Sequence, residues 1–301
     1  MAERPAVGID LGGTKIHAGV VAPDGRVLKD MRCPTEADKD AVTVMDNMRT
    51  AVHTVLERAG LEADDLAGVG LGSPAPLDIE EGVILSPGNL PSLHGYPVVE
   101  ELSGMLGMRV VLNNDANCFG LAEARFGAGR GAAVCCGLTL GTGLGGCLVF
   151  DGEVFNGPRG AGGEIWCSPH MGDHIEEKVS GRGVARNYEK VTEERHTARE
   201  LAQMARDGDE TARRAWEEFG RDLAVPLAWL CNALDPDVCV MGGSLAKAWD
   251  LFEATMLEEA HKYINAVTRE AVGIRRAELG EEAGMLGAAA LVLGKTAPAA
   301  G

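Results

Sequence analysis

One pattern of glycine turns occurs twice in the chain, and it limits what the chain can fold into more than any other feature. The first copy starts at Val7 and reads VGIDLGGTKIHAGVVAPDGRVL, and the second starts at Cys136 and reads CGLTLGTGLGGCLVFDGEVF. Each copy reads as strand, glycine turn, strand, Asp-Gly turn and strand. We therefore expect one structural unit used twice, in two lobes with a cleft between them, and such clefts are usual ligand sites.

The remainder of the chain alternates predicted strands with predicted helices. Helical periodicity marks residues 41–59, 183–232, 249–267 and 284–294, and strand patterns occur in LAGVGLGSPAPLD, MRVVLNN and DVCVMGG. This alternation predicts an α/β fold. We expect a first lobe of residues 1–113 that also contains the final helix, residues 283–301, and a second lobe of residues 114–282.

The charge and cysteine content exclude several classes of protein. The 301 residues carry a formal net charge of -17, which repels phosphate backbones and anionic membranes, so we expect neither nucleic acid nor membrane as a partner. No stretch reads as a signal peptide or a membrane span, and we expect a cytoplasmic protein. The eight cysteines follow no repeated spacing, which predicts free thiols in a reducing compartment.

The glycine turns are candidate phosphate cradles. Backbone N–H groups can approach phosphate oxygens closely where no Cβ intervenes, although one such turn alone is more typical of a plain hairpin. Asp10 beside the first turn can hold magnesium through water, and the third turn, followed by a helix, suits a nucleoside. Neither the P-loop nor the Rossmann pattern is present. The candidate nucleotide-binding residues are Asp10, Gly12, Gly13, Thr14, Lys15, Thr139, Gly141, Thr142, Gly143, Gly242, Gly243 and Ser244, of which Lys15 is also explained as a surface charge.

Asp115 is the candidate catalytic residue. It follows an apolar strand, in MRVVLNND, where a fixed carboxylate can accept the proton of an attacking hydroxyl group. Asn and Asp are also good helix N-caps, so capping explains the residues Asn113, Asn114 and Asp115 as well as catalysis does. The two roles are compatible.

At these residues the chain resembles the ROK family, which comprises sugar kinases and sugar-responsive repressors of the actin-like ATPase (ribonuclease H-like) fold. The family's two phosphate segments are similar to DLGGTK and LGTGLGG, its adenosine segment to VMGGSLA and its catalytic segment to LNNDAN, and the similarity runs from Val7 to about Leu293. The resemblance implies a two-lobed kinase that transfers the γ-phosphoryl group of ATP to a sugar hydroxyl with Mg²⁺. It also implies Asp115 as the base and assembly into a homodimer or homotetramer.

Within that resemblance we expect a hexose kinase with glucose as the leading substrate. N-acetylglucosamine, N-acetylmannosamine and fructose are the alternatives, and polyphosphate remains open as the phosphoryl donor. Repressors of the family carry a helix-turn-helix domain before the first phosphate segment, whereas six residues precede Val7 here and the chain is acidic. We therefore expect an enzyme and not a regulator.

The chain departs from the family in GGEIWCSPHMGDHIEEKVSG. The family has a G-E-x-G-H pattern there, followed by a zinc-binding cysteine cluster and a second Glu. In this chain Trp166 and Cys167 replace the Gly and the His, and the cysteine-rich part is absent. We expect both replacements to face the part of the pocket that recognises C1 and C2 of the sugar. The resemblance implies sugar contacts from Ala75, Asn89, Asn114, Asp115, Glu164 and Glu176.

The same segment also has the spacing of a small metal site. Cys167, His170 and His174 follow the pattern C-x₂-H-x₃-H. Zinc accepts these ligands, but a structural site normally has four, and Asp173, Glu176 or a distant residue would have to supply the fourth. The alternative is a shortened loop whose histidines lie at the surface or face the sugar. We expect the loop, with ATP and Mg²⁺ as cofactors and without zinc.

Overall fold

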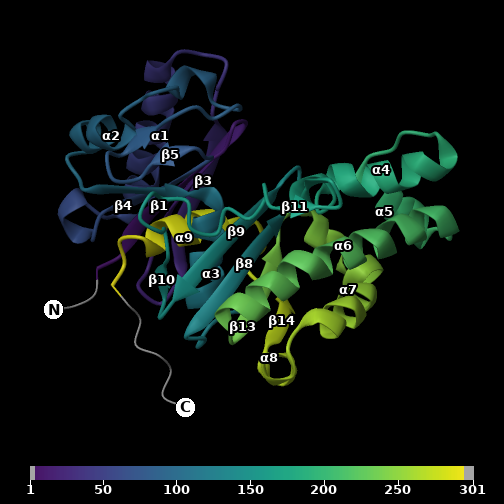
Figure 1. Cartoon of the computed structure of the whole chain (residues 1–301). Helices are drawn as coiled ribbons and strands as arrows, with labels where there is room; N and C mark the ends of the chain where they lie inside the picture. Colours follow the sequence, from purple (N-terminus) through teal and green to yellow (C-terminus); the bar gives the residue numbers. More distant parts are fainter. Residues whose placement is uncertain (1–3, 295–301) are drawn as a thin grey trace.

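Two five-stranded sheets of one topology form the frame of the molecule (Figure 1). The computed structural model describes residues 4–294. The first sheet contains β1 (Ala6–Leu11), β2 (Lys15–Val21), β3 (Val27–Pro34), β4 (Val69–Ser73) and β7 (Val110–Asn114), in the order β3-β2-β1-β4-β7. The second contains β8 (Val134–Leu140), β9 (Leu144–Phe150), β10 (Glu153–Val154), β13 (Val238–Gly242) and β14 (Gly273–Arg276), in the order β10-β9-β8-β13-β14.

The two sheets repeat the same pairing pattern. In each, three consecutive strands pair antiparallel, and two further strands add in parallel next to the first of them. Each copy of the glycine pattern therefore forms the first three strands of one sheet. The α/β fold with duplicated lobes that the sequence predicts is confirmed.

Helices cover the sheets, and short hairpins extend them. The first lobe carries α1 (Ala41–Ala59) and α2 (Val98–Leu106), with the hairpin strands β5 (Leu77–Asp78) and β6 (Val83–Ile84). The second lobe carries α4 (Gly181–Thr192), α5 (Ala198–Arg206), α6 (Glu210–Leu234), α7 (Trp249–Tyr263) and α8 (Ala266–Ala271), with the hairpin strands β11 (Pro169–His170) and β12 (Asp173–His174). Helices α3 (Asp115–Phe126) and α9 (Ala283–Ala290) lie between the sheets. None of the helices within residues 4–294 is long and apolar enough to span a bilayer.

Local signals in the sequence fix the ends of α1. The side chain of Asp40 accepts from the backbone N–H of Thr43, and Gly60 ends the helix with φ at 67°. Between these ends, apolar residues at helical spacing form one buried stripe against the first sheet: Val44, Met45, Met48, Ala51, Val52, Val55 and Leu56. The helix, its caps and its buried face follow directly from the sequence.

The second lobe differs from the prediction at one helix. The periodicity over residues 249–267 predicts a single helix, but α7 ends at Tyr263 and α8 begins at Ala266. The break occurs because the side chain of Asn265 caps α8 by accepting from the N–H of Thr268, and the Thr268 hydroxyl donates to Asp235 at 2.5 Å. A capping residue therefore overrides the hydrophobic period.

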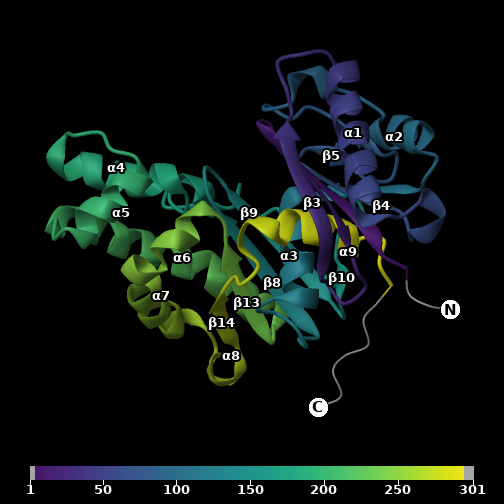
Figure 2. The ribbon, with the colours of Figure 1, turned by 180° about the vertical axis from the view of Figure 1, so that it is seen from behind.

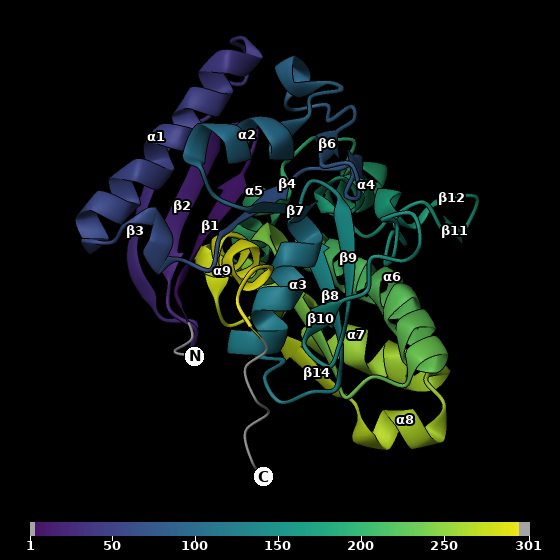
Figure 3. The same cartoon turned by 90° about the vertical axis from the view of Figure 1, so that its left-hand side faces the viewer.

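The two lobes meet through α3 and α9, which pack against each other between the sheets (Figures 2 and 3). Helix α9 lies on β1 and β4, and α3 lies on β8 and β9. This contact is close because glycines remove side chains from it. A Cβ on Gly70 would lie 1.7 Å from the carbonyl oxygen of Ala288, and one on Gly287 would lie 1.7 Å from that of Cys118.

We propose the lobe division that the sequence predicts, residues 1–113 with 283–301 and residues 114–282. Helix α9 supports it, since this last helix packs on strands of the first sheet. Residues 1–3 and 295–301 of the proposed first lobe lie outside the described residues.

Substitution of Gly70 by Ala tests the close contact of α9 with the first sheet. The new Cβ would overlap the backbone of Ala288, which cannot move without shifting α9, so we expect a loss of about 2 kcal/mol or more in the free energy of unfolding. Urea denaturation measures it. Gly104 is the control, because it lies exposed in α2 and a Cβ added there would have no atom within 4 Å, and Gly104→Ala should stabilise by roughly 0.5–1 kcal/mol. Equal effects of the two substitutions would contradict the contact.

Candidate active site

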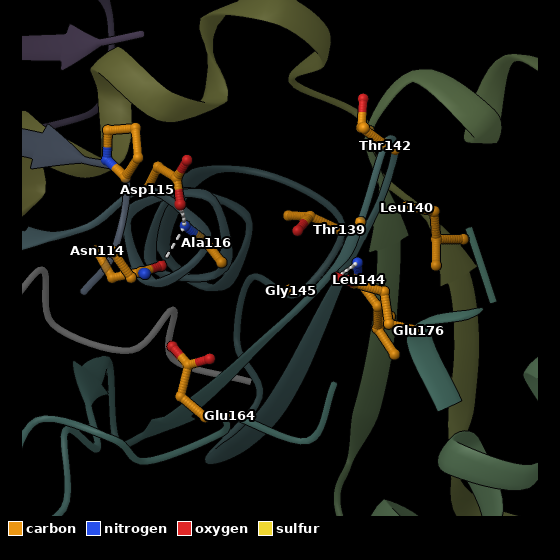
Figure 4. A pocket seen from close by; sticks show the side chains of 15 residues that line it. Asn114, Asp115, Ala116, Thr139, Leu140, Thr142, Leu144, Gly145, Glu164 and Glu176 are labelled. Carbon is orange, nitrogen blue, oxygen red and sulfur yellow. Dashed lines mark hydrogen bonds between the residues drawn. The ribbon is translucent and has the colours of Figure 1, made fainter. Parts of the chain in front are cut away.

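A cavity of about 340 Å³ opens next to the N-terminus of α3 (Figure 4). The residues after β4, the junction of β7 with α3, and the turn between β8 and β9 form most of its wall. It is lined by Pro74, Ala75, Asn114, Asp115, Ala116, Thr139, Leu140, Gly141, Thr142, Gly143, Leu144, Gly145, Glu164, Glu176 and Gly243. The structure thus brings together one part of the nucleotide set and most of the sugar set that the sequence predicts.

The junction of β7 with α3 places Asp115 at this cavity. Asn114 is the N-cap of α3, and its side-chain oxygen accepts from the backbone N–H groups of Ala116 and Asn117. Asp115 is the first residue of the helix, where its Oδ1 accepts from the N–H of Ala116 at 2.7 Å. The capping role therefore belongs to Asn114, which leaves the Asp115 carboxylate directed at the cavity.

The surroundings of Asp115 make its carboxylate basic. Burial, together with the negative charges of Asp10 and Glu164, raises its pKa from 3.8 to about 6, against the lowering effect of the hydrogen bond from Ala116. The ionised form still predominates at neutral pH, since the pKa lies about one unit below 7. A carboxylate with a pKa close to the working pH is suited to general base catalysis.

Asp10 is a second carboxylate near the cavity, and it is only partly exposed. It lies in β1 opposite His17 of β2, and a Cβ on Gly284 at the start of α9 would lie 2.7 Å from its Cγ. Burial raises its pKa, and the charges of His17, Lys15 and Arg32 lower it in part. A divalent cation bound near these two carboxylates would reduce their mutual repulsion.

The turn between β8 and β9 is tied to α4 through Glu176. Oε2 of Glu176 accepts from the backbone N–H of Leu144 at 2.9 Å, and its Oε1 accepts from Arg182 at 3.0 Å. The backbone N–H of Gly181 donates to the carbonyl of Gly141. Glu176 reaches the cavity, as expected of a sugar-binding residue, but it also orders the glycine turn.

A cluster of three asparagines lies behind the cavity, and the sequence reasoning missed it. Asn113 and Asn117 each donate from Nδ2 to Oδ1 of Asn156, at 3.0 and 3.3 Å. Asn117 also donates to Oδ1 of Asn113 at 2.8 Å. The cluster joins the β7–α3 junction to the loop that leads to Glu164. The spacing of four between Asn113 and Asn117 is the one signal for it in the sequence.

Several predicted residues lie outside the lining of this cavity. The first glycine turn is closed by a hydrogen bond from the Gly12 N–H to the Lys15 carbonyl, and Thr35 holds it by donating to the carbonyls of Gly12 and Thr14. Asn89 packs against this turn, since a Cβ on Gly13 would lie 2.9 Å from its Cβ. Asp10, Gly12, Gly13, Thr14, Lys15 and Asn89 of the first lobe, and Gly242 and Ser244 of the second, are absent from the lining.

The third glycine turn lies next to the second one. A Cβ on Gly243, whose φ is 86°, would lie 2.4 Å from the Leu140 carbonyl oxygen, so only glycine fits there. A Cβ on Gly141 would lie 3.7 Å from Oγ of Ser244. Lys15 forms an exposed ion pair with Glu281 at 3.8 Å.

The three possible zinc ligands, Cys167, His170 and His174, have separate surroundings. Nε2 of His170 donates to Oδ1 of Asp222 at 3.0 Å, and the His174 ring packs edge-on to Trp166 with centroids 5.8 Å apart. Cys167 is exposed. Within the part of the chain that the structure describes, no group of three Cys, His, Asp or Glu side chains is placed to hold a metal ion.

The expectation that Trp166 and Cys167 face the sugar pocket is wrong. Neither residue lines the cavity, and both are exposed, Trp166 to 38%. The chain turns outward here because Trp166 lies at the base of a hairpin, where its carbonyl accepts from the N–H of Glu176. The substitutions in the family pattern therefore change the surface beside the pocket and not its wall.

Known proteins of similar sequence and structure match this chain over almost their whole length. The sequence model of the ROK family matches residues 6–295. The chain is 30% identical to a glucokinase of Thermotoga maritima, over 97% of this chain and 98% of the relative, and 32% identical to an N-acetyl-D-glucosamine kinase of Vibrio cholerae, over 94% and 98%. A crystal structure of a ROK family glucokinase from Streptomyces griseus with glucose and AMPPNP has a TM-score of 0.78 and 28% identity, over 95% of this chain and 98% of that one.

These similarities and the two-lobed fold define the class of protein: an ATP-dependent sugar kinase with the actin-like ATPase fold. The chain belongs to the ROK family.

Substitution of Asp115 by Asn should affect activity and stability in opposite directions. Loss of the base should lower kcat by at least about 10²-fold. The raised pKa means that ionisation of this carboxylate disfavours the folded state above pH 6. Asp115 is exposed to the cavity, where water screens most of that cost, so the neutral amide should stabilise the fold only slightly at pH 7.5, by less than about 1 kcal/mol. Turnover and urea unfolding measure the two effects. Asp24→Asn, at an exposed turn, should leave both unchanged, and a destabilised Asp115→Asn would contradict the assignment.

Proposed function

We propose that the chain transfers the γ-phosphoryl group of ATP to a hexose, with glucose as the preferred substrate and glucose 6-phosphate as the product. Asp115 is the observation that carries this proposal. Its carboxylate, with a pKa of about 6, lines a cavity that also holds Glu164, Glu176 and a glycine turn. A base, sugar-binding carboxylates and phosphate-binding backbone in one cavity are what phosphoryl transfer to a hydroxyl requires.

Asp115 acts as the general base in this proposal. Its free oxygen accepts the proton of the attacking sugar hydroxyl while Oδ1 stays fixed by the N–H of Ala116. Its position at the first turn of α3, behind the cap of Asn114, restricts the carboxylate to one direction. Positioning of this kind, and not covalent chemistry, lowers the barrier in kinases.

The glycine turns hold the nucleotide. Backbone N–H groups of the turns at Gly12–Gly13 and Gly141–Gly143, with the hydroxyls of Thr14, Thr139 and Thr142, bind phosphate oxygens, and Lys15 adds a cation beside the first turn. The turn Gly242, Gly243 and Ser244 contacts the nucleoside. The adjacency of the second and third turns supports this division, because Ser244 lies beside Gly141.

A divalent metal fits beside Asp10. The carboxylate of Asp10 is partly exposed, desolvation raises its pKa, and its charge raises the pKa of Asp115, so a bound cation would lower both pKa values. Mg²⁺ commonly takes one or two carboxylates and keeps several waters. We propose that Asp10 holds Mg²⁺ through water. When bound, the ion neutralises charge on the phosphate oxygens.

The sugar lies between the carboxylates. Glu164 and Glu176 accept hydrogen bonds from the sugar hydroxyls, and Asn114, Ala75 and Asn89 complete the contacts. Glu176 can serve both the sugar and the turn, because a carboxylate has about four acceptor positions and two of them are used by Leu144 and Arg182. Binding of the sugar would thereby order the glycine turn that holds the phosphate.

A kinase for an N-acetylated hexosamine is the second candidate. The 32% identity to an N-acetyl-D-glucosamine kinase over 94% of the chain favours it. Its extra acetyl group requires space at C2, and Trp166 and Cys167 do not fill the cavity from that side. Fructose is a weaker alternative. We further propose a homodimer or homotetramer, which analytical ultracentrifugation would test.

The activity should depend on the ionisation of Asp115. A base must be deprotonated to act, so kcat/KM for the sugar should rise tenfold per pH unit below about 6 and reach a plateau above it. A pH profile of turnover with sugar and MgATP both well below their KM values measures this, because it reports the ionisation of the enzyme without bound substrates. A carboxylate with an ordinary pKa would place the bend near pH 4, and that result would exclude a raised pKa in the free enzyme.

A panel of sugars tests the substrate. We expect the highest kcat/KM with glucose and ATP in a coupled assay that also includes N-acetylglucosamine, N-acetylmannosamine and fructose, with polyphosphate as a second donor. Glu164→Gln should raise the KM for the sugar about tenfold and leave the KM for ATP unchanged. A higher kcat/KM for an acetylated hexosamine would reject glucose, and absence of turnover with any sugar would reject the kinase.

A further inference from the structure

The segment between the two sugar-side carboxylates is one hairpin. The N–H of Glu176 donates to the carbonyl of Trp166 at 3.2 Å, the N–H of Ile175 donates to that of Ser168 at 2.8 Å, and β11 pairs with β12 beyond them. Glu164 lies two residues before this hairpin, and Glu176 is its last residue. The position of the hairpin, residues 166–176, therefore helps to set where both carboxylates stand in the cavity.

One side-chain pair anchors this hairpin to the second lobe. Nε2 of His170 donates to Oδ1 of Asp222 in α6 at 3.0 Å, and only 13% and 10% of the two side chains are exposed. Met171, Asp173 and His174 at the tip are exposed instead. A mostly buried hydrogen bond to a charged group holds its geometry more firmly than a solvated one.

A second polar contact near the tip of the hairpin is an ion pair, and it is weaker. Arg186 of α4 lies 3.6 Å from Asp173, and 42% and 47% of these side chains are exposed. Exposed ion pairs at such distances are screened by water and contribute little. The pair of His170 with Asp222 is therefore the firmer polar contact near the tip of the hairpin. The base of the hairpin is held by the buried Ile175 side chain and by the bonds of Glu176 to Leu144 and Arg182.

A structural zinc, which the family resemblance implies for this segment, does not fit these residues. The ring nitrogen of His170 that faces α6 is bound to Asp222, the His174 ring is turned to Trp166, and Sγ of the exposed Cys167 lies 3.8 Å from the Glu164 carbonyl. Zinc would need these three side chains and a fourth to converge on one point. Their contacts instead direct them away from one another.

We propose that the hydrogen bond between His170 and Asp222 takes the place of a structural metal and positions Glu164 and Glu176 for the sugar. His170 and Asp222 are positioning residues that do not touch the substrate. The inference rests on the proposed function, because it assigns the two carboxylates to sugar binding. It extends that function by naming the contact that holds Glu164 and Glu176 in place in a chain without the cysteine cluster.

Kinetics of Asp222 variants test the inference. Asp222→Ala and His170→Ala should each raise the KM for the sugar by roughly tenfold and raise the KM for ATP by a smaller factor, because Glu164 acts on the sugar alone whereas Glu176 also orders the phosphate-binding turn. Asp222→Asn keeps an acceptor and should restore most of the sugar affinity. The double Ala variant should be no worse than either single one. An unchanged sugar KM in Asp222→Ala would overturn the proposal.

Matched variants separate positioning from folding. Asp173→Asn removes the exposed tie of the same hairpin and should leave the sugar KM within twofold of wild type. The double variant His170→Leu and Asp222→Leu replaces the pair by apolar groups, which often preserves stability. It should fold and still show the raised sugar KM, whereas normal sugar binding would overturn the proposal. Hydrogen exchange should be faster in residues 166–176 of Asp222→Ala and unchanged there in Asp173→Asn.

A metal assay completes the test. Wild-type protein dialysed against a zinc chelator and returned to Mg²⁺ should contain far less than one zinc ion per chain and keep full activity. Loss of activity that only zinc restores would overturn the proposal. If wild type turns over no sugar under any condition, the proposed function fails instead, and hydrogen exchange still reports whether the pair holds the hairpin.

Discussion

Asp10 and Asp115, two carboxylates of like charge, lie close enough to interact where the lobes meet, with Asp10 partly exposed and Asp115 open to the cavity, and the rest of the site depends on this arrangement. Burial raises the pKa of both, and the charge of Asp10 raises that of Asp115 further. Their mutual repulsion disfavours the ionised forms, and the exposure of Asp115 to the cavity moderates this effect. The raised pKa values are consistent with function, because a general base benefits from a pKa near neutral pH and neighbouring carboxylates attract a cation.

The packing of α3 against α9 brings the two carboxylates together. Asp115 begins α3, and Asp10 lies against the first residues of α9 at Gly284. Glycines such as Gly70 and Gly287 bring these helices and strands to backbone contact. The duplicated sheets therefore matter to catalysis chiefly as platforms that bring two helix ends and two glycine turns together.

The sequence predicts what depends on short stretches of chain. The glycine turns, the strand before Asp115 and the capped helix at Ala41–Ala59 have local signals, and so the two-lobed fold and the main cavity residues could be predicted. The contact of Asn156 with Asn113, and that of His170 with Asp222, join residues 43 and 52 positions apart and leave no periodic pattern. The orientation of Trp166 could not be predicted for the same reason, since a hairpin formed with Glu176 turns it outward.

A carboxyl ¹³C titration by NMR measures the pKa of Asp115 and its coupling to Asp10. We expect a pKa of about 6 for Asp115 in the ligand-free protein. We expect a lower pKa in Asp10→Asn, though one still above the ordinary value, because desolvation remains when the neighbouring charge is removed. A pKa near 3.8 in the wild-type protein, or one that Asp10→Asn leaves unchanged, would contradict the coupling of the two carboxylates on which the site is built.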